Sequence, residues 1–289
     1  MSNTAMPREQ LESNLRRFVL FRVLYSARFY YPVFTILFLD YGLTLEQFAV
    51  LNMVWALTIV LAEVPSGALA DIIGRKRLVV YAALLMVIEM AGLLWVPVGE
   101  SGFLFLAFLI NRVCSGLSEA AASGADEALA YDSLKALGRE SEWAHLLERT
   151  TRLMAVGFFT TMITGALVYD VSVVNGAIAF LGLDLVLEQQ TIIKFPVVLT
   201  FITACLVLII TLGLREVEAG SEQGSRGSAR DVRGLRQLLE PFRQILAAAR
   251  WTVDHRFVFF VILAALVLDS VARQFVVLAS EYYRVIDIP

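Results

Sequence analysis

Charged side chains inside long apolar runs are the first candidates for chemistry in this sequence. The richest series begins in the run 103–125 and is spaced at three or four residues, which places its members on one face of a helix: Arg112, Ser115, Glu119, Ser123 and Asp126. A charge at the centre of a bilayer costs about 2.5–3.5 kcal/mol on insertion scales, so such groups are expected to face protein or water. The series therefore predicts a water-filled pathway; the alternative is a charge pair that ties helices together.

The helical rise gives the expected depth of the two strongest charges. If this run enters the membrane at about residue 103, Arg112 lies roughly 14 Å deep at 1.5 Å per residue. That depth is close to the middle of an apolar layer about 30 Å thick. Glu119 lies about 10 Å further along the same helix.

Other runs carry polar side chains that could line the same pathway. Glu89 stands alone in its run and needs a partner from another helix, while Arg28 is a candidate partner for a carboxylate of the substrate or the protein. Arg22 lies close enough to the end of its run to extend to the surface. Asp269 and Arg273 are four residues apart with the acid first, so they line the cavity or simply neutralise each other. We predict a small-molecule cavity lined by polar and aromatic residues, namely Tyr25, Arg28, Thr35, Asn52, Trp55, Ser115, Asp269 and Arg273.

Apolar runs of about 20 residues dominate the chain, and each is long enough to cross a bilayer as a helix. There are seven such runs, at 17–39, 46–66, 78–98, 103–125, 152–170, 195–214 and 257–280. The stretch 171–193 is shorter and is interrupted by polar residues, so we read it as an external loop, with a half-embedded turn as a variant. The sequence therefore predicts an all-α integral membrane protein.

Lysine and arginine are distributed unevenly over the predicted loops. They are frequent before the first run and in every second loop after it, whereas 40–45 and 97–102 carry none and 171–194 carries only Lys194. Because cytoplasmic loops are enriched in positive charge, the N-terminus is predicted to be cytoplasmic. We expect the chain in the cell inner (plasma) membrane.

The predicted organisation has four parts. The linker includes a flexible stretch, 219–229, and a stretch with helical apolar spacing, 235–249, which lies on the membrane surface or covers the underside of the bundle. The parts are a cytoplasmic N-terminus at 1–16, a six-helix transmembrane bundle at 17–214, a cytoplasmic linker with an amphipathic helix at 215–255, and a seventh transmembrane helix at 256–289.

The composition excludes several classes of protein. With 58% hydrophobic and 18% charged residues and a mean hydropathy of +0.71, the 289-residue chain is unlike a soluble domain or a disordered segment. The net charge of −3 gives no electrostatic basis for binding nucleic acid. Cys114 and Cys205 lie in apolar runs, the chain has two histidines, and it has no P-loop, HExxH or G-x-S-x-G motif. We therefore expect no enzyme activity, no metal, no cofactor and no nucleic-acid partner.

The segment between the second and third runs resembles the loop signature of the major facilitator superfamily, G-x-L-A-D-x-x-G-R-K-R. The matching residues are Gly67, Leu69, Ala70, Asp71, Gly74, Arg75, Lys76 and Arg77. The two glycines are expected to let the chain turn tightly, and the basic residues to hold the loop on the cytoplasmic side. Ile72 stands where the family usually has a basic residue. The resemblance implies that this loop acts as a conformational latch.

A second stretch, Arg112–Ala120, is similar to the family pattern R-x-x-x-G-x-x-x-A. In the family this arginine is implicated in proton coupling, so the resemblance implies that Arg112 sets the protonation of a buried acid, for which Glu119 is our candidate. The fifth run lacks the G-P-x-x-G-G signature of the drug/proton antiporters, which weakens an assignment to that group.

The resemblance implies a fold of twelve helices in two bundles, of which this chain would hold the N-terminal six-helix bundle and the first helix of the second. Such transporters rock two bundles around a site at mid-membrane. We expect a secondary transporter that moves a small molecule, with protons as the coupling ion and efflux as one direction. The chain is then a fragment, a truncated gene product, or one that a separate C-terminal bundle completes. The alternative is a truncated membrane protein that does not transport and acts as a scaffold.

Overall fold

The computed structural model describes residues 6–99, 102–217 and 250–286, and all regular structure in these ranges is helical. The chain divides into two compact units, Met1–Ala219 and Gly220–Pro289. The long helix described in the second unit is α12 (Arg256–Val285), which covers the seventh predicted run and follows a helical stretch at 250–254. The predicted linker stretches 219–229 and 235–249 lie outside the described residues, as do the side chains of Asp269 and Arg273.

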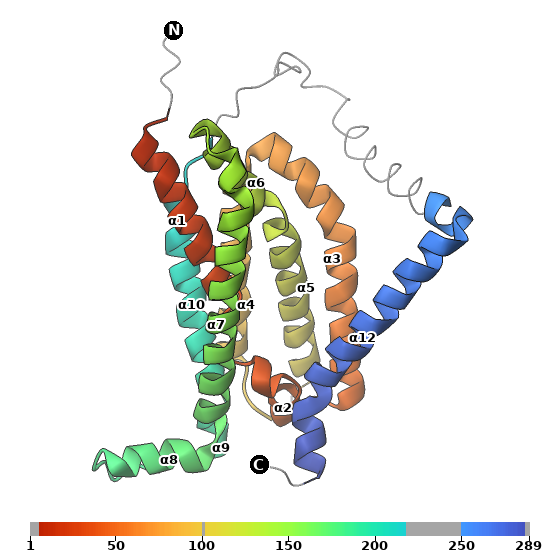
Figure 1. Ribbon diagram of the computed structural model, residues 1–289. Coiled ribbons are helices and arrows are strands. Elements are labelled where there is room, and N and C mark those ends of the chain that lie inside the picture. The colour runs from red at the N-terminus through yellow and green to blue at the C-terminus, as the bar shows by residue number, and fades with distance from the viewer. Residues whose placement is uncertain (1–5, 100–101, 218–249, 287–289) are drawn as a thin grey trace. The chain divides into compact units, whose positions relative to one another are not determined.

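The first unit is a bundle of long helices joined by short ones (Figure 1). Its elements are α1 (Arg8–Tyr25), η1 (Tyr31–Val33), α2 (Phe34–Asp40), α3 (Leu45–Ile73), α4 (Arg75–Trp95), α5 (Leu104–Ala122), α6 (Ala125–Ala136), η2 (Glu140–Glu142), α7 (Trp143–Tyr169), α8 (Val171–Phe180), α9 (Gln189–Ile192) and α10 (Phe195–Leu212).

Five described helical segments are long and apolar enough to cross a membrane, and they coincide with the second to sixth predicted runs. They are Leu45–Ala70, Arg75–Trp95, Leu104–Ala136, Glu140–Tyr169 and Gln189–Leu212. Large apolar side chains lie exposed on their outer surfaces, for example Val60 on α3 at 67% and Phe159 on α7 at 67%. Such a surface needs an apolar surrounding, which is consistent with a multi-pass membrane protein.

The interior of the first unit lies around α4, which packs against α5 and α10. Ala82, Ala83, Met86 and Met90 of α4 are fully buried. Small side chains at 82 and 83 allow the neighbouring helices to approach closely, and the two methionines fill the remaining space. Asn14 of α1 ties the bundle together at one end, because its amide bonds both Ser133 of α6 and the backbone of Arg215 after α10.

The first predicted run is broken, which differs from the single span that the sequence predicts. α1 ends at Tyr25, and helical structure resumes only at Tyr31. Pro32 explains the break, because a proline has no N–H to donate and its ring would clash with the carbonyl group of Arg28 in a continuous helix.

A neighbouring helix replaces a hydrogen bond that the break costs. The backbone N–H of Phe29 donates to the Thr200 hydroxyl of α10 at 3.1 Å. The Thr203 hydroxyl lies 3.5 Å from the carbonyl of Ala27, but it donates its single proton to the nearer carbonyl of Thr200 at 2.8 Å. α7 approaches from another direction at Gly165, where an added Cβ atom would lie 1.8 Å from the carbonyl oxygen of Phe29. Two spans, α7 and α10, therefore hold the unwound segment in place.

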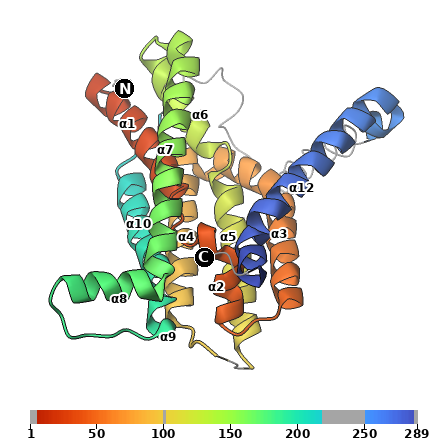
Figure 2. The same ribbon diagram turned by 60° about the horizontal axis from the view of Figure 1, so that its bottom comes forward.

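The stretch 171–193 contains helices rather than the loop that the sequence predicts. α8 and α9 occupy most of it, and α8 runs crosswise to α7 in both views (Figures 1 and 2). The ten residues of α8 cover about 15 Å at the α-helical rise, which is half of the apolar thickness of a bilayer. The segment is therefore not a further span.

Candidate functional site

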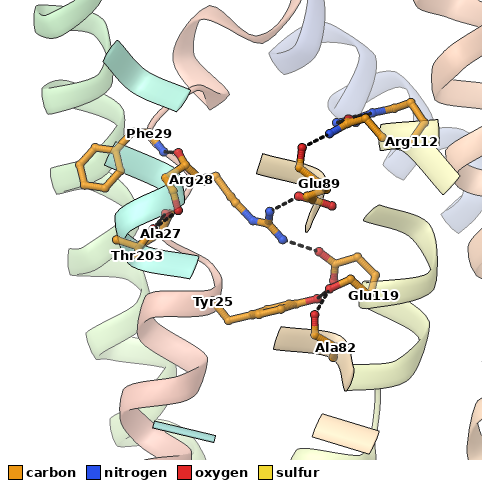
Figure 3. Close-up of polar contacts among 12 residues, drawn as sticks. Tyr25, Ala27, Arg28, Phe29, Ala82, Glu89, Arg112, Glu119 and Thr203 are labelled. Atoms are coloured by element: carbon orange, nitrogen blue, oxygen red, sulfur yellow. Dashed lines mark hydrogen bonds and ion pairs between the residues drawn. The ribbon is translucent and has the colours of Figure 1, made fainter. Parts of the chain in front are cut away.

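The break in the first run places Arg28 between two carboxylates from two other helices (Figure 3). Its Nη1 donates to Oε1 of Glu89 on α4 at 2.5 Å, and its Nη2 lies 3.6 Å from Oε1 of Glu119 on α5. The side chains of Arg28 and Glu89 are 1% and 0% exposed, whereas that of Glu119 is 35% exposed. We call these three residues the Arg28 cluster. It contains one close, buried ion pair and one longer, accessible contact.

The partner that Glu89 requires is therefore Arg28, a pairing of residues 61 positions apart. The pair is not fully satisfied by hydrogen bonds. Within the described part of the chain, Nε and Nη2 of Arg28 and Oε2 of Glu89 are buried and have no hydrogen-bond partner. Buried polar groups in native proteins are usually hydrogen-bonded, so such an exception needs an explanation.

Tyr25 supports the guanidinium of Arg28 from the end of α1. The centre of the guanidinium lies 5.3 Å from the Tyr25 ring centroid, within range of a cation–π interaction. The Tyr25 hydroxyl lies 2.7 Å from that of Ser118, and the Ser118 hydroxyl donates to the Ala82 carbonyl at 2.8 Å. Because Ser118 has a single hydroxyl proton, Tyr25 donates to Ser118. This chain of bonds fixes the ring beneath Arg28.

Arg112 lies in a different environment from the one that the sequence predicts. Its Nε and Nη2 donate to the Asn111 amide oxygen at 3.2 and 3.0 Å, and its guanidinium lies 5.2 Å from the ring centroids of both Phe34 and Phe38. Asn111 in turn donates to the backbone carbonyl of Glu89 at 2.8 Å. In the described part of the chain, the ion pairs of this region involve Arg28, and none involves Arg112.

The structure describes four further residues of the predicted cavity. Thr35 and Ser115 are buried, at 0% and 5% exposure, and Trp55 is half-buried. The side-chain amide of Asn52 donates to the carbonyl of Phe48 one turn earlier in its own helix. Among the six predicted cavity residues whose side chains are described, Arg28 belongs to the Arg28 cluster and Tyr25 lies against it.

An arginine of α1, Arg22, makes a similar arrangement nearer the end of the bundle. Arg22 contacts Asp126 at 3.3 Å and Glu127 at 2.7 Å, both on α6. Asp126 is buried, with its side chain 2% exposed, whereas Glu127 is 39% and Arg22 is 32% exposed. We call these residues the Arg22 cluster. Arg22 is partly exposed near the end of its run, and α6 supplies it with two carboxylates that the sequence does not indicate as its partners.

The predicted latch loop is held by residues from α6 and from the segment after α10. The Glu216 carboxylate accepts from the backbone N–H groups of Arg75 and Lys76 at 3.0 and 2.8 Å, so it caps the start of α4. The Arg75 guanidinium pairs with Asp132 and also donates to the Ala128 carbonyl at 3.2 Å. The motif alone gives no signal for Glu216, because it lies about 140 residues away in the sequence.

Of the two glycines of the loop, one forms the predicted turn and the other does not. Gly74 separates α3 from α4 with φ of 97°, a conformation that favours glycine, so the tight turn is confirmed there. Gly67 lies inside α3, where an added Cβ atom would meet nothing within 4 Å, so the turn predicted at Gly67 is wrong. Leu69 and Arg77 are exposed, and the side chain of Asp71 lies outside the described residues.

Metal binding finds no support in the described ranges. They contain no group of three or more histidine, cysteine, aspartate or glutamate side chains that could hold a metal ion. Cys114 and Cys205 are free thiols and half-buried. No protein family, no curated protein and no solved structure matches this chain in the comparisons. The resemblance to the major facilitator superfamily therefore rests on the motif residues alone.

Proposed function

We propose that this chain is the N-terminal half, with the first helix of the second half, of a secondary transporter of the major facilitator class. It moves a small molecule across the inner (plasma) membrane, with protons as the coupling ion and the N-terminus in the cytoplasm. The other half would come from the continuation of the chain or from a separate polypeptide. The observation that carries the proposal is the unequal sharing of Arg28 between Glu89 and Glu119.

The unequal sharing supports an exchange reaction at Glu119. Arg28 and Glu89 form a close pair that neutralises itself in a buried place. Glu119 is then the second carboxylate for a single arginine, held at a longer distance and accessible at its outer edge. Protonation of Glu119 removes a charge without leaving Arg28 unpaired, because Glu89 still compensates it. A proton, or a cationic group of a substrate, can therefore bind to the Glu119 carboxylate while the rest of the cluster stays in place.

The unwound backbone that carries Arg28 also supports a transporter. Unwound backbone at membrane depth, such as the segment that carries Arg28, is tolerated in transporters where it lines a cavity or is buried in protein.

We assign two supporting roles to the motif residues. Arg112 acts through Asn111, which holds the backbone of Glu89, and through its own fixed positive charge. The loop at Gly74–Arg77 acts as the latch, and the contacts of Arg75 with Asp132 and of its backbone with Glu216 are those that would open and close.

Reconstituted proton flux tests the proposal. The 289-residue chain is placed in liposomes that contain a pH-sensitive dye, and proton movement is recorded as a panel of small cations and neutral solutes is added. Glu119→Gln is expected to reduce solute-driven proton flux at least about tenfold, because an amide neither binds nor releases a proton in this range.

Glu127→Gln is the matched control, because Glu127 is also a half-exposed glutamate bound to an arginine of α1. Its flux should stay within about twofold of the unaltered chain, since an exposed pair is screened by solvent. Equal flux in the Glu119→Gln variant and the unaltered chain would refute the exchange role. Absence of flux from every preparation, including one supplied with a C-terminal half, would favour the scaffold alternative.

A further inference from the structure

Hydrogen bonds give the α8 hairpin, residues 171–187, a defined structure. The Asp170 carboxylate accepts from the backbone N–H groups of Ser172 and Val173 at 2.7 and 3.0 Å and from the Ser172 hydroxyl at 2.5 Å. The bond from that hydroxyl, followed by the one from the Val173 N–H group, holds the pKa of Asp170 below its usual range. A charged cap therefore starts α8 directly after α7 ends at Tyr169.

The return segment of the hairpin is fixed against the helix. The Asn175 amide donates to the Leu187 carbonyl at 3.0 Å and accepts from the Leu187 N–H group at 2.8 Å. This reciprocal pair closes the chain that leaves α8 back onto the middle of the helix. The hairpin therefore projects from the end of α7 as one unit (Figure 2).

The hairpin exposes apolar side chains along its length. None of the ten residues of α8 is buried. Phe180 is 92%, Leu181 72% and Val186 82% exposed, and Asp184 is the one charged residue in 171–187. Several exposed apolar side chains on a single element are typical of a site that meets lipid or another protein.

Neighbouring residues indicate the level of the hairpin relative to a bilayer. Lys194, which follows the hairpin, donates from Nζ to the carbonyls of Leu94 and Val96 at 3.0 and 3.1 Å, so the hairpin returns to the far end of α4. Trp95 between them is 88% exposed. Tryptophan and lysine collect at membrane–water boundaries, which places this end of α4 at such a boundary.

We propose that the α8 hairpin lies in the headgroup layer of the leaflet opposite the Gly74–Arg77 loop, with Phe180 and Val186 inserted into the upper acyl region. The partner is a lipid surface, and a zwitterionic one fits best, because 171–187 carries one negative charge and no positive charge. The inference rests on the membrane placement in the proposed function and is independent of transport. The hairpin would anchor the ends of α7 and α10 at a fixed depth.

Fluorescence depth measurement tests this placement in phosphatidylcholine liposomes. Phe180→Cys is made in a Cys114→Ser, Cys205→Ser background and labelled with an environment-sensitive dye, and lipids with nitroxides at a shallow or a deep position quench it. The shallow nitroxide should quench the label at position 180 at least about twofold more strongly than the deep one. Glu148→Cys on α7 is the aqueous control, and Ile202→Cys, 50% exposed near the middle of α10, is the deep control.

Three outcomes would overturn the inference. The label at 180 could show the weak lipid quenching expected of the aqueous label at 148. It could instead be quenched most strongly by the deep nitroxide, like the label at 202. It could also lose lipid quenching as the protein-to-lipid ratio rises, which would identify a second copy as the partner. If the label at 202 is also aqueous, the membrane placement itself fails, and this outcome is distinct from the others.

A second measurement needs no substitution and covers the case in which the cysteine-free background does not fold. The unaltered chain is reconstituted with a phosphatidylcholine analogue that carries a photoreactive group near the headgroup, and the crosslinked peptides are identified by mass spectrometry. Crosslinks within 171–187 are expected. Their absence, with crosslinks present around Trp95, would contradict the placement.

Discussion

The Arg28 and Arg22 clusters each contain one arginine and two carboxylates, but their geometry is opposite. Each joins one arginine of the first run to one buried and one half-exposed carboxylate. Arg28 makes its shorter contact, 2.5 Å, with the buried Glu89, whereas Arg22 makes its shorter contact, 2.7 Å, with the half-exposed Glu127. The accessible acid is therefore the loosely held one in the Arg28 cluster and the tightly held one in the Arg22 cluster.

Burial of the arginine explains why this difference matters. The side chain of Arg28 is 1% exposed, so any change of charge around it occurs in a medium of low dielectric constant. Arg22 is 32% exposed, so solvent screens its contacts. One arginine with two carboxylates thus forms a weakly screened charge cluster in the interior and a solvent-screened one near the end of the bundle.

From the comparison of the two clusters we expect the largest loss of stability when Arg28 is replaced. Arg28→Leu leaves Glu89 buried without a partner, so we expect the free energy of unfolding to fall by about 3–5 kcal/mol. Unfolding by titration with a denaturing detergent measures the change. The double variant Arg28→Leu, Glu89→Leu should recover most of the loss, because neither charge is then buried alone. A single variant as stable as the unaltered chain would contradict the buried pair.

A loss of stability of intermediate size is expected from a substitution at Gly165, where α7 approaches the break in the first run. Gly165→Ala places a methyl group against the Phe29 carbonyl, and we expect a loss of about 1–3 kcal/mol, or more if the backbone cannot shift. Gly67→Ala is the matched control, because it lies inside α3 with nothing near its Cβ position. Thermal unfolding in detergent compares the two. Equal stability of both variants would mean that α7 does not support the segment that carries Arg28.

The smallest effect is expected at Arg22. Arg22→Gln removes the partly exposed contact with Glu127, but its amide can still donate to the buried Asp126, so we expect a change within about 1 kcal/mol in the same unfolding measurement. High salt should reduce even this difference, since exposed charges are screened over a Debye length. A loss as large as that of Arg28→Leu would mean that burial of the arginine is not what separates the two clusters.

Long apolar runs and short motifs account for what the sequence predicts correctly. Runs two to six appear as helices of spanning length, because about 20 apolar residues impose a helix wherever backbone groups cannot bond water. The turn at Gly74 was also predictable, since its glycine and basic neighbours are local signals.

The sequence alone could not predict the break in the first run or the partners of the charged side chains. Pro32 signals a distortion, yet its outcome depends on Thr200 and Gly165, which belong to distant helices. The helical spacing that joins Arg112 to Glu119 is real, but their side chains reach different neighbours, since Arg112 contacts aromatic rings of α2 and Glu119 contacts Arg28. Periodicity gives the face of a helix and leaves open which helix covers it.

The sequence by itself determined that this chain is a set of apolar helices with charges at depths where they are costly, because hydropathy and helical rise are local properties. Only the tertiary structure decided which charge belongs to which. The pairing of Arg28 with Glu89, of Arg22 with Glu127, and of the α4 terminus with Glu216 each joins elements far apart in the chain. Those pairings follow from the order in which the helices pack, and packing is a property of the whole bundle.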